Sequence, residues 1–70
     1  MSDPEPSLEG LIGRISIPVP EDGPGEIIIS IRGGTEAFTA YTVGEESLTK
    51  NSRAVIVERT GARTVLVTGF

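Results

Sequence analysis

The sequence contains no cysteine, no histidine and no tryptophan, and aromatic residues make up only 4% of its 70 positions. Without cysteine the chain can form neither disulfides nor the thiolate sites that hold zinc and iron–sulfur clusters. Without histidine it lacks the usual general base of serine and cysteine hydrolases and the commonest metal ligand. We therefore expect no catalytic residue, no metal site and no cofactor.

Long hydrophobic runs are also missing. The apolar runs, such as Ile27–Ile29, are only three or four residues long, far below the roughly 18 residues of a membrane-spanning helix. Residues 1–7 are acidic and proline-rich, and they lack the basic and apolar regions of a signal peptide. The chain carries 10 acidic and 6 basic residues, for a net charge of -4. We expect a disordered lead over residues 1–9, then one small acidic domain over 10–70 that does not itself insert into a membrane.

Five short apolar runs, separated by glycine, proline and polar residues, favour an all-β fold. The expected strands are 11–17, 26–32, 35–43, 53–59 and 64–68. Gly33–Gly34 predicts a tight hairpin turn, and residues 44–52 support at most one helical turn, closed by Asn51 in the left-handed conformation. A sheet of this size protects its edges by closing, which predicts a five-stranded OB-fold barrel with Greek-key topology. An SH3-like barrel is the alternative architecture.

Alternation along the strands assigns their side chains to two faces. The face predicted to form the core carries Ile15, Ile17, Ile27, Ile29, Phe38, Ala40, Val55, Val57, Val65 and Val67. The opposite face also carries apolar side chains, at Ile12, Ile28, Ile56 and Leu66. These four either pack as a second, minor core or contribute to a surface that contacts another protein.

Two outward residues are the best candidates for a protein contact. Ile28 interrupts an otherwise polar strand face, and Tyr41 combines apolar area with a hydroxyl group, a property favoured in contact surfaces. With Ile12 and Leu66 they form the predicted set of contact residues.

Other motifs are explained by ordinary turn and surface chemistry. No histidine is present to activate the serines, and the adjacent acids Glu21–Asp22 and Glu45–Glu46 do not fix a carboxyl separation. An OB fold also raises the hypothesis of nucleic-acid binding, with Tyr41 as a stacking ring and a basic groove built from Arg32, Arg59 and Arg63. The net charge of -4 opposes phosphate binding, so nucleic acid is not the expected ligand.

Five segments, at 10–15, 20–23, 38–40, 48–57 and 61–67, resemble in their order the NfeD C-terminal domain. The run from Gly10 to Ile15 is similar to the opening of that domain, and 20–23 to its Pro-x-x-Gly turn. Phe38-Thr39-Ala40 resembles its aromatic-x-Ala strand, while Leu48 with 55–57 and the hairpin 61–67 resemble its closing pattern. The chain departs from the family at Asn51, where glycine is usual, and in a longer first turn over 18–25.

The resemblance implies an OB domain that follows hydrophobic helices in a membrane-associated protein and assembles with stomatin- or flotillin-type scaffold proteins. It implies no catalytic residue, because the serine protease domain of longer family members has no counterpart here. We expect a non-enzymatic protein–protein interaction module on the cytoplasmic side, membrane-associated through its parent protein and soluble as an isolated domain. The alternative is a free-standing OB module that binds a small ligand or an oligonucleotide.

Overall fold

The computed structural model describes residues 7–31 and 33–70 of the chain, and this part contains five β-strands and no helix. The strands are β1 (Ile12–Ile17), β2 (Gly25–Ile31), β3 (Gly34–Thr42), β4 (Arg53–Gly61) and β5 (Thr64–Gly69). Each strand lies within two residues of a predicted run, because glycines, prolines and polar turn residues interrupt strand pairing where the sequence places them.

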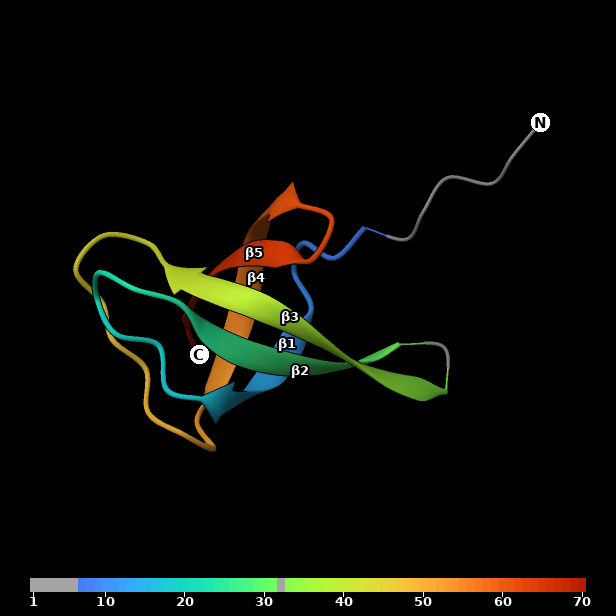
Figure 1. Cartoon of the computed structure of the whole chain (residues 1–70). Coiled ribbons are helices and arrows are strands. Elements are labelled where there is room, and N and C mark those ends of the chain that lie inside the picture. The colour runs from blue at the N-terminus through green and yellow to red at the C-terminus, as the bar shows by residue number, and fades with distance from the viewer. Residues whose placement is uncertain (1–6, 32) are drawn as a thin grey trace.

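The five strands close into a barrel in the order β1-β2-β3-β5-β4. β3 and β5 run parallel, whereas all other neighbouring strands are antiparallel. In Figure 1, β2 and β3 cross in front of β4, and together they extend past the rest of the barrel. This is the five-stranded OB order, so the predicted fold is confirmed.

Four described residues have a left-handed backbone, and two of them lie in turns that the sequence predicted. Asn51 adopts a φ of 72°, as predicted, and Gly33 adopts a φ of 79° between β2 and β3. The predicted Gly33–Gly34 turn is displaced by one residue, because Gly34 already pairs with Ile31 as part of β3. The segment between β3 and β4 consists of turns and an isolated bridge, without the helical turn that the sequence allowed.

The core lies inside the barrel, and seven of the ten predicted core residues are buried there. They are Ile15, Ile27, Ile29, Phe38, Ala40, Val65 and Val67. Three predictions were wrong, because Ile17 and Val57 are 52% and 46% exposed and Val55 is half-buried. Their places are taken by Ala54 and Ile56, which are fully enclosed.

β-Bulges explain two of these corrections. In β1 the register shifts between Ile15 and Ile17, so that Ile17 pairs with Glu26 and turns to the outer face. In β4 the register shifts between Ile56 and Glu58, which leaves Val57 without a partner in β5. The buried pair Ile56–Val67 sets the inner face of β4, so Ile56 is core and not, as predicted, an outward residue.

Residues outside the strands complete the core at both ends of the barrel. Val19 and Leu48 form an isolated bridge in which the N–H of each donates to the C=O of the other, over 2.9 and 2.8 Å. This bridge joins the loop between β1 and β2 to the loop between β3 and β4, at the left of Figure 1. Both side chains are buried, so the proline-rich first turn contributes directly to the core.

The folded part begins earlier than the sequence indicated. Leu8 is buried in the core, two residues before the expected start at Gly10. Residues 1–6 of the predicted lead, like Arg32, lie outside the described residues. At the other terminus, the backbone N–H of Phe70 donates to the carbonyl of Arg53, while its side chain is 77% exposed.

Candidate functional site

The four predicted contact residues separate into two pairs on the outside of the barrel. Ile12 of β1 and Ile28 of β2 line the same groove, whereas Tyr41 and Leu66 lie opposite each other in the parallel pairing of β3 with β5. Tyr41 is 40% exposed and Ile12 is 45% exposed, while Ile28 and Leu66 are half-buried.

Ile28 and Tyr41, the two best candidates from the sequence, do not adjoin. Ile28 pairs with Ala37, and Tyr41 lies four positions further along β3. At a rise of about 3.3 Å per residue, that separation is roughly 13 Å. A single small contact therefore does not centre on both residues, and we name Tyr41 with Leu66 the β3–β5 patch.

A second apolar surface was missed by the sequence analysis. Ile12 pairs directly with Val55, and Val57 follows two residues later on the outer side of β4. These three residues, Ile12, Val55 and Val57, form what we call the β1–β4 strip. The signal was present but ambiguous, because residues 54–57 are all apolar and alternation alone does not say which two face inward.

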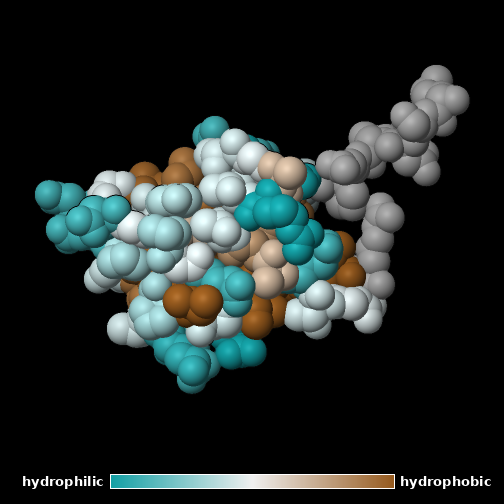
Figure 2. Space-filling view, in the orientation of Figure 1, coloured by the Kyte–Doolittle hydropathy of each residue, from teal (hydrophilic) through white to brown (hydrophobic). Residues whose placement is uncertain are grey.

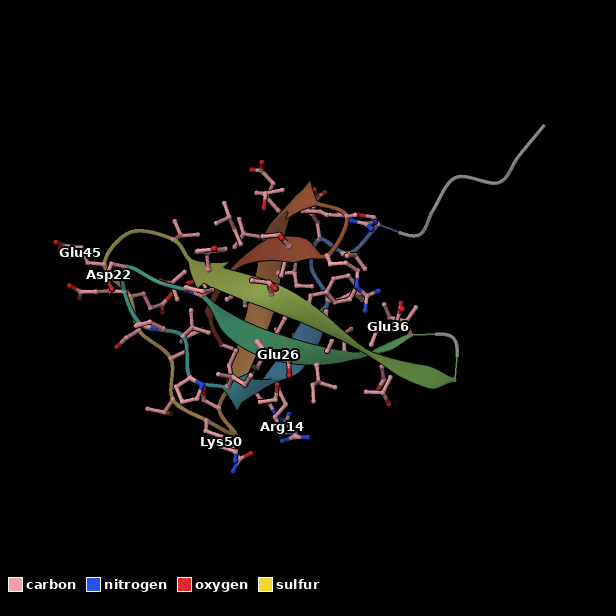
Figure 3. All side chains as sticks on the ribbon, viewed as in Figure 1. Arg14, Asp22, Glu26, Glu36, Glu45 and Lys50 are labelled. Atoms are coloured by element: carbon pink, nitrogen blue, oxygen red, sulfur yellow. The ribbon has the colours of Figure 1, made fainter. Side chains whose placement is uncertain are left out.

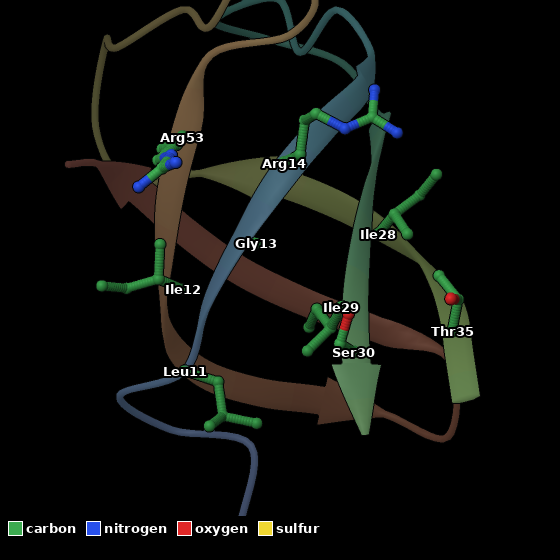
Figure 4. Close-up of a pocket in the computed structure, with 9 residues that line it drawn as sticks. All are labelled: Leu11, Ile12, Gly13, Arg14, Ile28, Ile29, Ser30, Thr35 and Arg53. Carbon is green, nitrogen blue, oxygen red and sulfur yellow. The ribbon is translucent and has the colours of Figure 1, made fainter. Parts of the chain in front are cut away.

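An open groove adjoins this strip where β1 and β2 diverge (Figure 4). It has a volume of about 580 Å³ and is called here the β1–β2 groove. Its lining consists of Leu11, Ile12, Gly13, Arg14, Ile28, Ile29, Ser30, Thr35 and Arg53. A second hollow, of about 570 Å³, lies between the two bridged loops and is lined largely by prolines and by Val19 and Leu48.

The two charged side chains that line the β1–β2 groove are both positive, although the chain as a whole is acidic. Arg14 and Arg53 lie opposite each other on β1 and β4, and both side chains are exposed. Arg14 Nη1 donates to Asn51 Oδ1 over 3.0 Å, and neither arginine forms an ion pair within the described residues. Figure 3 shows Lys50 on the same side of the molecule as Arg14, while Asp22 and Glu45 lie at the loop end.

The face of the molecule seen in Figure 2 is mostly polar, and hydrophobic side chains appear on it as small separate patches. Scattered apolar residues of this kind are normal for a folded domain. The β1–β4 strip is distinguished from them by direct cross-strand pairing and by its continuity with the groove.

Of the three arginines considered for nucleic-acid binding, Arg59 and Arg63 are engaged within the domain, and Arg32 lies outside the described residues. Arg63 bonds the Glu36 carboxylate at 3.2 Å and the Ala37 carbonyl at 3.0 Å, and its guanidinium lies 5.0 Å from the centre of the Phe38 ring. Arg59 donates to the carbonyls of Gly61 and Ala62. Arg59 therefore braces the β4–β5 hairpin, and Arg63 joins this hairpin to β3.

Metal and membrane signals are lacking in the described part of the chain. Residues 7–31 and 33–70 hold no group of three or more acidic, histidine or cysteine side chains suited to a metal ion. In the same ranges, no helix reaches the length and hydrophobicity needed to cross a bilayer.

The family model of the NfeD C-terminal domain matches residues 12–68, which include all of β1 to β4 and nearly all of β5. The chain belongs to the NfeD C-terminal domain family. The match begins at β1 and ends one residue before the end of β5, so the family pattern describes the barrel itself.

Two solved structures resemble this NfeD domain. The soluble domain of the NfeD protein YuaF from Bacillus subtilis aligns with a TM-score of 0.77 and 27% identity, over 89% of this chain and 73% of that one. The C-terminal domain of stomatin operon partner protein 1510-C from Pyrococcus horikoshii aligns with a TM-score of 0.73 and 20% identity, over 96% and 97% of the two chains. Because the Pyrococcus horikoshii domain shares only 20% sequence identity with this chain, its similarity shows a common fold and nothing more. A search among proteins with curated descriptions found no match.

Proposed function

We propose that this NfeD domain is a non-enzymatic interaction module that docks onto a stomatin- or flotillin-type membrane scaffold protein. Family membership supports the proposal, as does the name of the Pyrococcus horikoshii relative, which is called a stomatin operon partner. The observation that carries it is the β1–β4 strip, an exposed apolar surface on the outside of a barrel whose interior is already filled.

The strip has the anatomy of a small contact surface. Its side chains are β-branched and lie on paired strands, so they present a rigid apolar area that loses little entropy on binding. Exposed Arg14 and Arg53 border it, which supplies the polar rim that contact surfaces usually have. An area this small favours weak binding, which clustering of the partner on a membrane would strengthen through avidity.

The test compares two pairs of substitutions, one in the β1–β4 strip and one in the neighbouring β3–β5 patch. A purified stomatin- or flotillin-type protein of the same organism, reconstituted in vesicles, is titrated with the wild-type domain, with Ile12→Glu/Val57→Glu and with Tyr41→Ser/Leu66→Thr. We expect the first variant to bind at least about tenfold more weakly, because a contact centred on the strip would bury its carboxylates. The second variant, which alters the β3–β5 patch, is expected to bind as wild type does.

The outcomes separate the two surfaces. Loss of binding only in the second variant would move the contact to Tyr41 and Leu66, whereas equal binding by all three proteins would refute both surfaces. Absence of binding by wild type to every scaffold protein of this type would refute the proposed partner. Circular dichroism spectra of the variants must match wild type for the comparison to hold.

The proposal places the domain beside a membrane on the cytoplasmic side, attached through its parent protein and without inserting itself. Flotation with protein-free anionic vesicles checks this, since we expect the isolated domain to stay with the soluble fraction. The alternative, an oligonucleotide-binding module, predicts affinity for short single-stranded DNA or RNA that falls steeply with salt. We expect no such affinity, because Arg59 and Arg63 bond to their own hairpin and to neighbouring residues.

A further inference from the structure

The β1–β2 groove is bordered by backbone groups that have no partner strand. β1 pairs with β2 only from Arg14 onward, and its earlier residues Ile12 and Gly13 pair with β4 alone. On the other side, Ser30 and Ile31 of β2 pair with β3 and with no residue of β1. Figure 4 shows the resulting gap, which widens from Arg14 toward Leu11 and Ser30.

The register determines which way the N–H and C=O of Ser30 point. In antiparallel strands, successive residues direct these groups alternately to one neighbour and to the other. Ile31 pairs with Gly34 across a two-residue loop, so Ile31 and Ile29 direct their groups to β3. Ser30 therefore directs its own N–H and C=O away from β3, into the groove.

The same reasoning applies to Ile12 on the facing strand. The N–H of Ile15 donates to Ser52 of the segment before β4, and the C=O of Leu11 accepts from Ile56 of β4. The odd-numbered residues of β1 therefore direct their backbone N–H and C=O groups toward β4, whereas Ile12 directs these groups toward β2. Within the described residues, the registers of β1 and β2 give neither Ile12 nor Ser30 a partner across the groove.

Such an edge invites pairing with another extended chain. Proteins usually protect exposed edges with proline, with lysine or with charges that point inward, yet none of these occupies 28–31 or 11–13. Ser30 is exposed, so the edge is accessible, and the groove opens beyond Gly13, which still lies against the carbonyl oxygen of Ile28.

The surrounding side chains specify the chemistry of the partner. An added strand directs alternate side chains inward, toward half-buried Leu11 and buried Ile29, and outward, toward the solvent side where Arg14 and Arg53 stand. Apolar residues suit the first direction. Carboxylates suit the second, because the two adjacent cations repel each other and gain from a shared counter-charge.

The geometry points to the β1–β2 groove as a docking site for an extended peptide segment of a protein partner, with alternating apolar and acidic residues, that pairs with the edge of β2 at Ser30. The inference rests on the proposed function in one respect only, namely that a protein partner supplies the segment. It adds the site, the binding mode and the sequence character of that segment.

The probe is the capped peptide Thr-Val-Glu-Val-Glu-Val-Thr, titrated into the ¹⁵N-labelled domain and followed by NMR and amide hydrogen exchange. We expect the amides of Ser30 and Ile12 to exchange fast in the free domain, and the Ser30 amide to slow by at least about tenfold when peptide is bound. A peptide with Lys in place of Glu and one with Pro in place of the central Val are expected to bind at least about tenfold more weakly.

Substitutions in the domain test the backbone and the charges separately. Ser30→Pro removes the edge N–H without removing a hydrogen bond to β3, and it should abolish peptide binding, whereas Ser30→Ala keeps the N–H and should bind as wild type. Arg14→Ala/Arg53→Ala should weaken binding by about tenfold or more. If Ser30→Pro does not fold, the exchange rates of the wild-type amides still decide the matter.

Several results would overturn the inference. The first is a set of peptide-induced chemical-shift changes centred on the β3–β5 patch, and the second is equal binding of the Lys and Glu peptides. The third is self-association of the domain that is lost in Ser30→Pro, because a second copy of the chain would then be the occupant of the groove. Competition distinguishes this inference from the proposed function. A scaffold protein that binds the domain without displacing the peptide supports the proposed partner but refutes the groove as its docking site. Peptide binding at Ser30 without any scaffold binding refutes only the proposed partner.

Discussion

The assignment of Ile56, and not Val57, to the core can be tested by truncating each residue in turn. Ile56 is 1% exposed and pairs with buried Val67, whereas Val57 lies at a bulge and is 46% exposed. Ile56→Ala removes three buried carbons, worth about 2.4 kcal/mol of transfer free energy at roughly 0.8 kcal/mol per carbon. The cavity left behind raises the expected loss to about 3–4 kcal/mol. Val57→Ala should cost less than about 1 kcal/mol, because its side chain stays largely in water in both states.

Urea unfolding followed by circular dichroism measures the two free energies of unfolding. A domain of 70 residues is expected to have an unfolding free energy of about 4–10 kcal/mol, so the loss expected for Ile56→Ala is a large part of it. Ile56→Val, with an expected loss of about 1 kcal/mol, provides a gentler second variant. A larger loss for Val57→Ala than for Ile56→Ala would show that the inner face of β4 is wrongly assigned.

Three further predictions concern single residues. Gly25→Ala should lower the unfolding free energy by about 1–3 kcal/mol in urea titrations, because the added methyl would meet the carbonyl oxygens of Ile17 and Pro18. Asn51→Ala should lower the melting temperature, because alanine at a φ of 72° costs about 1 kcal/mol of backbone strain. Asn51→Gly loses the same side chain without this strain, so it should melt near wild type. Arg63→Ala should cost about 0.5–1.5 kcal/mol in thermal unfolding, because its ion pair with Glu36 is exposed and its contact with Phe38 is modest. A loss above about 3 kcal/mol would contradict this interpretation.

β2 and β3 could be assigned from the sequence because their alternation is unambiguous. Ile27 and Ile29 alternate with polar Glu26 and Ser30 except at Ile28, and glycines mark the hairpin. Period-two patterning of this kind specifies both the strand and its inner face, since a slip by one residue would expose the isoleucines. The structure buries Ile27 and Ile29, as predicted.

β1 and β4 could not be assigned completely, for a different reason in each strand. A bulge in β1 turns Ile17 outward, and a bulge depends on the neighbouring strand and not on local pattern. In β4, residues 54–57 are apolar throughout, so the sequence permits either face to be the inner one. The β1–β4 strip could not be recognised in the sequence for the same reason, because it consists largely of residues assigned to the core.

The sequence by itself determined that this protein is a small acidic all-β domain without thiol or imidazole chemistry, since composition sets those limits and turn residues set the strand ends. Gly33 and Asn51 also located two of the positions where the backbone turns left-handed. Only the tertiary structure decided where β1 parts from β2, which leaves Ser30 and Ile12 with unpaired edges above a groove flanked by Arg14 and Arg53. The physical reason is that barrel closure constrains all five strands together, whereas each local pattern constrains only its own strand.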